Sequence, residues 1–159
     1  MGGILRWLII GLLLALLPMT IPDDEGLHYS EINLPLIVSQ DDINCTAYII
    51  WDEARGEPLQ GQRAVLDVIL TRMVKRDMTA CQVIKQPRQF SGWHLGMKMS
   101  VTKQMLTTYE IVSNMKPVVE QAEFFHAEYV KPAWRLRLDK IKQIAHHIFY
   151  APKQKEKQK

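Results

Sequence analysis

The sequence predicts one mostly helical α+β domain behind a hydrophobic N-terminal segment. First, apolar residues recur at helical spacing in three segments, whereas one short stretch, residues 123–127, is typical of an extended strand. Second, the 159 residues leave about 110 for the domain, which is enough for a single core. Third, 47% apolar and 23% charged residues are an ordinary balance for a globular protein.

The N-terminal segment, residues 1–22, is predicted to direct export. Arg6 supplies a positive charge, and residues 7–17 are apolar and uncharged. This run is shorter than the roughly 20 residues that cross a bilayer, and it fits the hydrophobic region of a secretory signal. Because Pro18 follows in place of a clear cleavage site, the segment is either a signal peptide or a retained signal-anchor. Residues 23–40 are expected to form a linker.

The domain is predicted to span residues 41–150 and to open with a helix. Asp41 or Asp42 is the expected N-cap of this helix. The apolar residues that follow at helical spacing are Ile43, Ala47, Ile50, Trp51 and Ala54. Gly56 and Pro58 are expected to end the helix, because a proline steers the residue before it away from the α region.

The later elements are predicted from the same periodicity and from the positions of Pro and Gly. They are a helix over residues 60–75, a segment over 76–100 that is mainly loop, a helix over 101–115, an extended stretch over 123–127 and a partly helical segment over 139–150.

The tail, residues 151–159, is basic and is expected either to be solvated or to bind an anionic envelope polymer or membrane surface weakly. Nucleic acid is not an expected partner, because no basic stripe with interleaved exposed aromatic residues is evident in the folded part.

The chain contains two cysteines, Cys45 and Cys81. In an exported protein, an isolated pair is most simply one disulfide. The bond would tie the first helix to the segment that follows the second helix. The alternative is two buried free thiols. Neither cysteine has the surroundings expected of a catalytic thiol.

Residues 51–58 contain the strongest candidate for a catalytic residue. Glu53 lies at the margin of the apolar stripe near the end of the first helix, so we expect it to be half buried. Burial would raise the pKa of its carboxyl group toward a value that suits proton donation. The alternative is a surface glutamate paired with an arginine. Asp52 is expected to be solvated, whereas Glu57 is expected to brace the turn, against Arg55.

The chain offers one clear candidate acid and no convincing second carboxylate. Hydrolysis of a glycosidic bond usually needs two carboxylates. One acid suffices if the 6-hydroxyl of N-acetylmuramic acid is the nucleophile, which gives a 1,6-anhydro product by transglycosylation. Glu53 would first protonate the leaving oxygen and then accept the hydroxyl proton. The single acid therefore gives weak support to transglycosylation.

No metal site and no cofactor are expected. His94, His126, His146 and His147 do not form the His-Glu-x-x-His pattern of a zinc enzyme. His126 is expected to end a strand and to face the groove, or to hold backbone by hydrogen bonds. The aromatic residues of the predicted loops either pack in the core or stack on sugar rings; they are Phe90, Trp93, Tyr129 and Trp134.

Four short blocks resemble the SleB-type cell-wall hydrolase family, named for the spore-cortex-lytic enzyme. They are Glu-Ala-Arg-Gly-Glu-Pro at 53–58, Gln-Phe-Ser at 89–91, Phe-Phe-His-Ala at 124–127 and His-Ile-Phe-Tyr at 147–150. The resemblance covers residues 43–150 and implies a small lysozyme-like fold, related to resuscitation-promoting factors and lytic transglycosylases, that acts on peptidoglycan glycan strands. Thr71 and Ala145 depart from the family pattern, which often has Asn and Gly at these positions.

The resemblance also implies roles for individual residues. Glu53 matches the catalytic glutamate of the family. We expect the substrate contacts to be Gln89, Phe90, His126, Tyr129 and Trp134. The residues expected to support the site are Arg55, Glu57 and His147.

The resemblance implies a muramidase or lytic transglycosylase that acts as a monomer after export, in the periplasm or anchored to the inner membrane and facing the cell wall. An uncleaved N-terminal segment would add the membrane as a partner. A phage endolysin and a bacterial wall-remodelling enzyme both fit this description. Two other functions are alternatives. The protein is either an N-acetylmuramoyl-L-alanine amidase or a membrane-anchored wall-binding protein that is not an enzyme.

Overall fold

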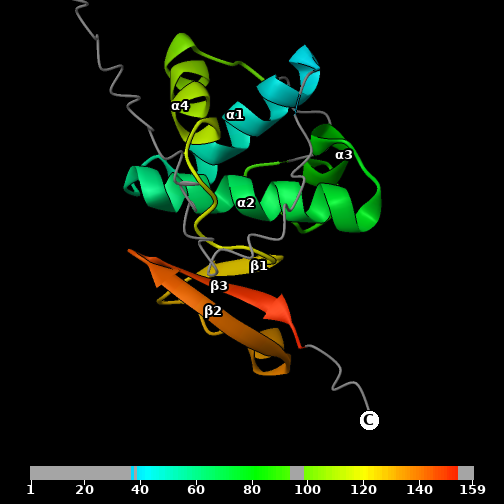
Figure 1. Cartoon of the computed structure of the whole chain (residues 1–159), viewed down its shortest axis with the longest axis vertical. Helices are drawn as coiled ribbons and strands as arrows, with labels where there is room; N and C mark the ends of the chain where they lie inside the picture. The colour runs from blue at the N-terminus through cyan, green and yellow to red at the C-terminus, as the bar shows by residue number, and fades with distance from the viewer. Residues whose placement is uncertain (1–36, 38, 94–98, 154–159) are drawn as a thin grey trace, which may run out of the picture. The chain divides into compact units, whose positions relative to one another are not determined.

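The structure, a computed structural model, describes residues 37, 39–93 and 99–153 (Figure 1). The expected export segment, His94 and residues 154–159 of the expected tail lie outside the described residues. The same holds for the expected linker, apart from residues 37, 39 and 40. Within the described ranges, no helix is both long and apolar enough to cross a membrane.

The described residues form four α-helices followed by a three-stranded antiparallel sheet, so the predicted mostly helical α+β class is confirmed. The elements are α1 (Gln40–Ala54), α2 (Leu59–Arg76), α3 (Ala80–Ile84), α4 (Lys103–Ser113), β1 (Phe124–Ala127), the 3-10 helix η1 (Ala133–Arg137), β2 (Leu138–Ile144) and β3 (His147–Pro152). The strand order is β1-β3-β2, and α2 lies between the sheet and the other helices (Figure 1).

The first helix begins before the predicted acidic cap and ends where predicted. The Ser39 side chain accepts a hydrogen bond from the Asp42 N–H at 3.2 Å, so Ser39 is the N-cap of α1 and the prediction of Asp41 or Asp42 was wrong. Both aspartates instead lie in the first turn, where they complement the helix dipole. The helix ends at Ala54, directly before the predicted Gly56 and Pro58.

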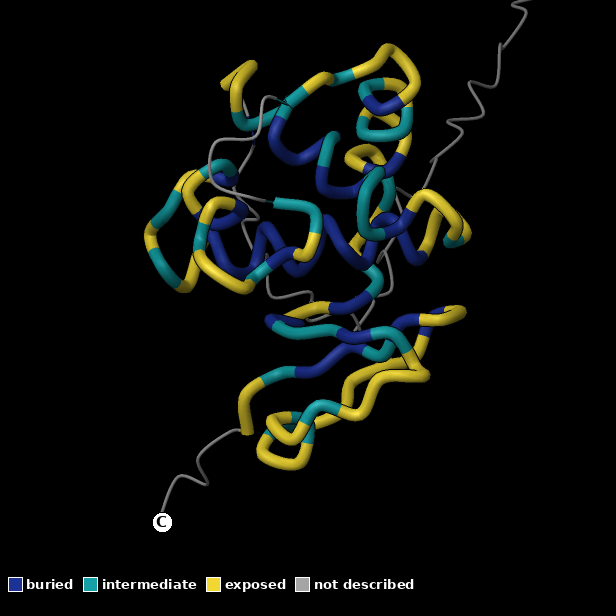
Figure 2. Tube along the Cα trace, turned by 180° about the vertical axis from the view of Figure 1, so that it is seen from behind, coloured by how far each residue is buried: buried dark blue, intermediate teal, exposed yellow. Residues whose placement is uncertain are grey.

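The second helix is the centre of the domain. Every residue from Gly61 to Met73 is buried, so α2 has no solvated face along this stretch (Figure 2). Of its predicted apolar residues, Val65 and Ile69 pack in the core between the helices. Ala64 and Val68 pack in the core between α2 and the sheet. Because the whole circumference is covered, the polar residues of α2 also need partners inside the protein.

Arg63 and Asp67 satisfy this requirement together. The Arg63 Nε donates to Asp67 Oδ1 at 2.7 Å, and the Arg63 Nη1 donates to the Val112 carbonyl at 2.9 Å. The other Asp67 carboxylate oxygen accepts the N–H groups of Val118 and Val119 at 2.7 and 3.1 Å. One buried ion pair therefore fixes the end of α4 and the chain that leads into β1.

The segment over residues 76–100, predicted to be mainly loop, contains the five-residue helix α3, which is too short for periodicity to reveal; Thr79 and Gln82 cap it with reciprocal hydrogen bonds. The prediction for the C-terminal segment was wrong. The predicted partly helical segment over residues 139–150 is the β2–β3 hairpin. Its inward side chains include Ile144 and Phe149, and this strand alternation was mistaken for part of a helical stripe.

The predicted disulfide is confirmed between Cys45 of α1 and Cys81 of α3, with a Cα–Cα distance of 5.4 Å. A second contact supports the same junction, because the Cys81 N–H donates to the Asp42 carboxylate at 2.7 Å. Since α3 begins the chain that leads to residue 93, the disulfide holds the base of that chain against α1.

Reduction of the disulfide is expected to lower the free energy of unfolding. The bond closes a loop with a sequence separation of 36, for which the chain-entropy model gives about 3 to 4 kcal/mol. Urea unfolding with and without a thiol reductant measures the change. A Cys45→Ala, Cys81→Ala variant is the control, since its stability must not respond to the reductant.

Ala145→Gly is expected to stabilise the domain. Ala145 lies in the β2–β3 turn with a φ of 44°, a left-handed conformation that costs an L-residue about 1 to 2 kcal/mol. Glycine removes this cost at some loss of entropy, so we expect a gain of about 1 kcal/mol in thermal or urea unfolding. Ala151→Gly, at the next-to-last residue of β3, is the matched control and is expected to destabilise. A loss of stability in both variants contradicts the argument.

Candidate active site

Glu53 lies in the last turn of α1 and is half buried, as predicted. Its Oε1 accepts two hydrogen bonds from Ser91, one from the backbone N–H at 2.8 Å and one from the hydroxyl at 2.9 Å. These bonds fix the carboxyl group from a second segment of the chain. Oε2 has no hydrogen-bond partner among the described residues, so this oxygen is free to act on a ligand.

Phe90 explains why Ser91 reaches Glu53. Its ring is only 6% exposed, and it packs against Phe125 of β1 at a centroid distance of 6.4 Å. The Arg72 guanidinium of α2 lies 5.2 Å from the same ring. Phe90 therefore anchors the loop in the core, and its ring is not presented to solvent as expected for a sugar-stacking residue.

Arg72 is a site-supporting residue that the sequence did not indicate. Its guanidinium lies between the rings of Phe90 and Phe124, and its Nε donates to the Glu123 carbonyl at 2.7 Å. Burial, together with the charge of Arg76, lowers the pKa of Arg72 to about 10. Arg72 thus remains charged at neutral pH and connects the loop of Ser91 to the first strand.

Asp52 also contacts this loop, and the prediction that it is solvated was wrong. Asp52 is half buried, and a Cβ atom built on Gly92 would lie 1.8 Å from its Oδ2. Residue 92 must therefore be glycine unless the Asp52 side chain moves. As a result the loop can lie close to the end of α1.

Glu57 braces the α1–α2 turn, but through other partners than Arg55. Its carbonyl accepts a hydrogen bond from Gln62 Nε2 at 2.9 Å, and its Oε2 accepts the His146 N–H at 3.2 Å. The second bond joins the turn to the tip of the β2–β3 hairpin. Arg55 is exposed and forms no ion pair with another described residue.

The hairpin tip is closed by a second polar contact. The His146 Nδ1 lies 2.9 Å from Glu128 Oε1, and Gln143 donates to Glu128 Oε2 at 2.8 Å. The hydrogen bond to His146 lowers the pKa of Glu128, and the same bond, with the charge of Glu57, raises the pKa of His146. Both groups are at the surface, so the pair orients the tip more than it stabilises the fold.

His147 is a buried histidine that the fold brings near Glu53 and Glu57. It is 8% exposed, and its ring lies 5.2 Å from Phe125 and 6.2 Å from Phe149. Burial lowers the pKa of His147, against the opposing influence of the Glu57 and Glu53 charges. The buried Nδ1 has no hydrogen-bond partner among the described residues.

His126 lies on the opposite face of the sheet from His147. Strand alternation places Phe125 and His147 on the helix side, whereas His126 and Tyr150 share the other side. The His126 Nε2 lies 3.0 Å from the Tyr150 hydroxyl, and its Nδ1 lies 2.8 Å from the Ala127 carbonyl. The structure therefore gives His126 the hydrogen-bonding role and does not bring it to Glu53.

The other expected substrate contacts are spread over the domain. Gln89 is half buried in the loop that carries Ser91. Trp134 is 36% exposed and packs against His126 and Tyr150, on the face of the sheet away from His147. Tyr129 is 84% exposed just after β1. Of this set, only Gln89 and Phe90 belong to a segment that contacts Glu53.

A cavity of about 320 Å³ lies elsewhere and includes Ser39, Asp42 and Gln82 in its lining. Asp42 and Glu53 are about 16 Å apart along α1, at 1.5 Å per residue, so this cavity is not part of the Glu53 site. No group of three or more potential metal ligands occurs among the described residues.

The site that emerges is a carboxyl group at a helix end, held by one loop and bordered by the sheet. Ser91 fixes one oxygen of Glu53, Asp52 lies against Gly92, and Glu57 accepts one bond from His146. Glu53 is thus a carboxyl group that is fixed through one oxygen and open at the other, which suits proton transfer.

Comparison with known proteins gives consistent matches. Residues 56–150 match the family model described as Cell Wall Hydrolase. The spore cortex-lytic enzyme of Oceanobacillus iheyensis is 32% identical over 122 residues, which are 74% of this chain and 44% of that protein. The spore cortex-lytic enzyme of Bacillus subtilis is 30% identical over 122 residues, which are 74% of this chain and 40% of that protein. The chain therefore spans less than half the length of these relatives.

Solved structures give the same result. The catalytic domain of the Bacillus cereus SleB protein aligns with a TM-score of 0.62 and 29% identity, over 75% of this chain and 96% of that domain. The catalytic domain of the germination-specific lytic transglycosylase SleB from Bacillus anthracis aligns with the same TM-score and identity, over 73% of this chain and 98% of that domain. These bacterial relatives give no support to a phage endolysin. The chain belongs to the SleB-type cell wall hydrolase family.

Proposed function

We propose that the protein is an exported enzyme that cleaves the glycan backbone of peptidoglycan as a lytic transglycosylase, with Glu53 as its general acid and base. The observation that carries the proposal is the Glu53 carboxyl group, which Ser91 fixes through one oxygen and leaves free at the other. The solved relative that is described as a lytic transglycosylase supports the choice of reaction.

In the first step, Glu53 donates its proton to the glycosidic oxygen as the bond from C1 of the muramic acid to that oxygen breaks. Ser91 donates two hydrogen bonds to Oε1, so the transferable proton belongs on Oε2. The same donors stabilise the carboxylate that remains after the transfer. The sugar is left with oxocarbenium character at C1.

In the second step, the 6-hydroxyl of the same muramic acid attacks C1 and gives its proton to the Glu53 carboxylate. The product is a 1,6-anhydro sugar, and the acid returns to its starting protonation state. This route needs no second carboxylate. The bond between Glu57 Oε2 and the His146 N–H favours it over a two-carboxylate hydrolysis that uses Glu57.

Export is part of the proposal because the substrate lies outside the cytoplasm. The Cys45–Cys81 disulfide supports it, since such bonds persist in oxidising compartments. The signal peptide or signal-anchor over residues 1–22, the linker, the basic tail and the monomeric state stay predictions.

Glu53→Gln is expected to lower the rate of peptidoglycan cleavage by about 100-fold or more, the contribution typical of a general acid. Gln keeps the size of the side chain and an oxygen that can accept from Ser91, so the loop contact is retained. Turbidity loss of purified sacculi measures the rate, and thermal unfolding checks the fold. Glu120→Gln, at an exposed position, is the matched control. Full activity of Glu53→Gln removes Glu53 from the mechanism.

Mass spectrometry of the released fragments is expected to show 1,6-anhydro-muramic acid ends. Reducing muramic acid ends would instead indicate a muramidase, and free stem peptides would indicate an amidase. Binding to sacculi without release of any fragment would indicate a wall-binding protein that lacks activity.

A further inference from the structure

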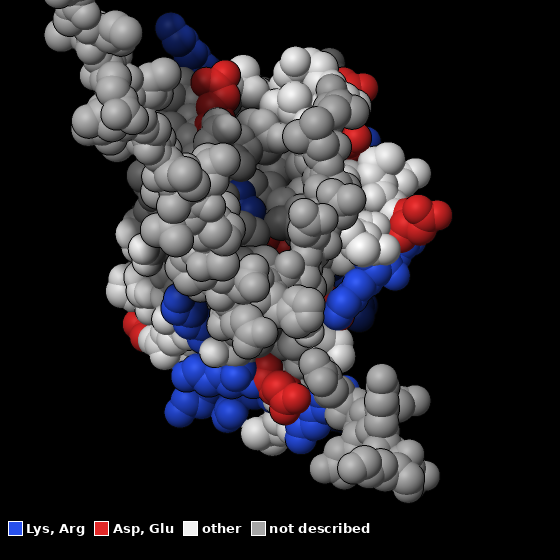
Figure 3. Space-filling view, viewed as in Figure 1, with Lys and Arg blue, Asp and Glu red and all other residues white. Residues whose placement is uncertain are grey.

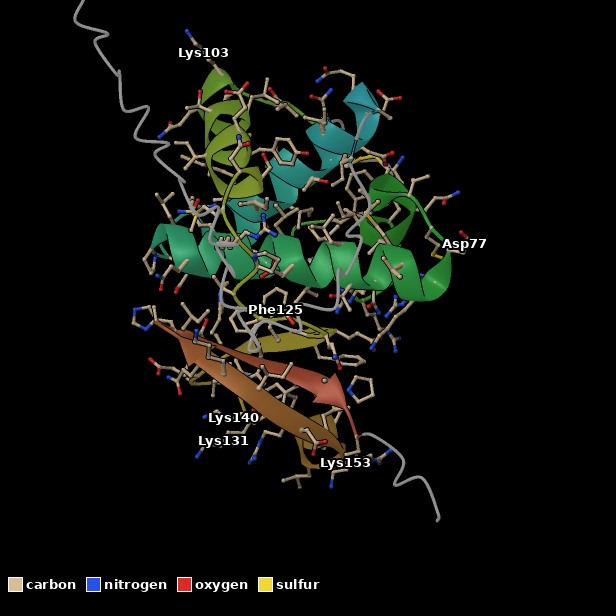
Figure 4. The ribbon with its side chains drawn as sticks, in the orientation of Figure 1. Asp77, Lys103, Phe125, Lys131, Lys140 and Lys153 are labelled. Atoms are coloured by element: carbon tan, nitrogen blue, oxygen red, sulfur yellow. A yellow bond between two sulfur atoms is a disulfide. The ribbon has the colours of Figure 1, made fainter. Side chains whose placement is uncertain are left out.

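Basic and apolar side chains gather on the surface formed after β1. The basic face is defined as Lys131, Arg135, Arg137, Lys140 and Lys153. Asp139 is the one carboxylate in residues 129–142. Figure 3 shows Lys and Arg gathered over the part of the domain that carries the sheet, and Figure 4 shows Lys131, Lys140 and Lys153 on the side of β2 away from the helices.

The cations of the basic face are free to bind an external anion. The ion pairs within the described residues are Arg63–Asp67, Lys75–Glu123 and His146–Glu128, and none of them involves the basic face. Arg135 is half buried and the other four side chains are exposed.

Apolar side chains project from the same segment. Tyr129 is 84% exposed, Leu136 is 70% exposed and Val130 is 42% exposed. Much of the chain between β1 and β2 is coloured as exposed in Figure 2. Exposed apolar side chains next to unpaired cations do not stabilise a domain that is surrounded by water. The surface therefore suits a partner that can bind both cations and apolar groups.

Trp134 holds this segment rigid. One side of its ring packs against Phe124, His126 and Tyr150 at centroid distances of 5.5 to 5.7 Å. The ring thus fixes η1 to the sheet, and Leu136 is displayed from a defined turn rather than from a flexible loop.

We propose that the basic face is a docking surface for an anionic phospholipid bilayer. Lys and Arg would contact the headgroups while Tyr129, Val130 and Leu136 enter the boundary with the acyl chains. An anionic wall polymer matches the cations but offers no apolar layer for Leu136 and Val130. A second copy of the chain would bring like charges together.

Docking in this way leaves the Glu53 site open. Lys140 pairs with Tyr150, whose side chain lies on the face of the sheet opposite His147. The Glu53 loop and His147 are on the helix side of the sheet. The bilayer and the glycan strand would therefore occupy different sides of the domain.

Sedimentation of the full chain with vesicles tests the inference. One set is phosphatidylcholine alone, and the other also contains phosphatidylglycerol; the N-terminal segment is identical in all variants. We expect a preference for the anionic vesicles that Lys140→Glu lowers about 25-fold, since two charge units change at about fivefold each. Lys103→Glu is the matched control, at the opposite end of the domain in Figure 4, with an expected change below about twofold. Leu136→Ser is expected to weaken binding to both sets by roughly threefold to tenfold.

Two outcomes overturn the inference. The first is equal binding of the unaltered chain to both vesicle sets, or an equal effect of Lys140→Glu and Lys103→Glu. The second is Lys140-dependent binding to purified sacculi or duplex DNA without a preference between vesicles, which assigns the face to an anionic polymer. Because the readout is binding, neither outcome bears on the activity proposed for Glu53.

Discussion

The buried ion pair of Arg63 and Asp67 is the interaction on which the arrangement of the domain depends. Removing either partner would leave an uncompensated charge in the core, a cost of several kcal/mol. The two side chains also use their remaining capacity on backbone groups of Val112, Val118 and Val119. In this way the central helix fixes the chain on both sides of the link between α4 and β1, and the sheet takes its position from α2.

The sheet position in turn shapes the surroundings of Glu53. Phe125 of β1 packs against Phe90, which anchors the loop of Ser91, and the hairpin tip reaches Glu57 through His146. The carboxyl group is therefore held by parts of the chain that are far apart in sequence. Such a held position suits the role proposed for Glu53, since an acid that drifts would lose its alignment with the scissile bond.

Much of the fold follows from local sequence signals. The end of α1, the centre of α2 and the disulfide were predicted because a helix-breaking pair, a long apolar period and an isolated cysteine pair are local features. The β2–β3 hairpin was not, since His147 and Phe149 gain their inward direction from pairing with β1. Glu53 was identified by its place at a helix end, but Ser91 needed the three-dimensional contact. Arg72 and the basic face are products of packing that no periodicity shows.

The link between Cys45 and Cys81 also decides when the domain reaches its full stability. A native domain is typically stable by about 5 to 15 kcal/mol, so a crosslink worth about 3 to 4 kcal/mol is a large share of the total. That share is missing from a newly made chain in a reducing cytoplasm. For an exported enzyme, as proposed above, the domain would thus reach its full stability only after its thiols are oxidised outside the cytoplasm, where the loop beside Glu53 would gain its support at α3.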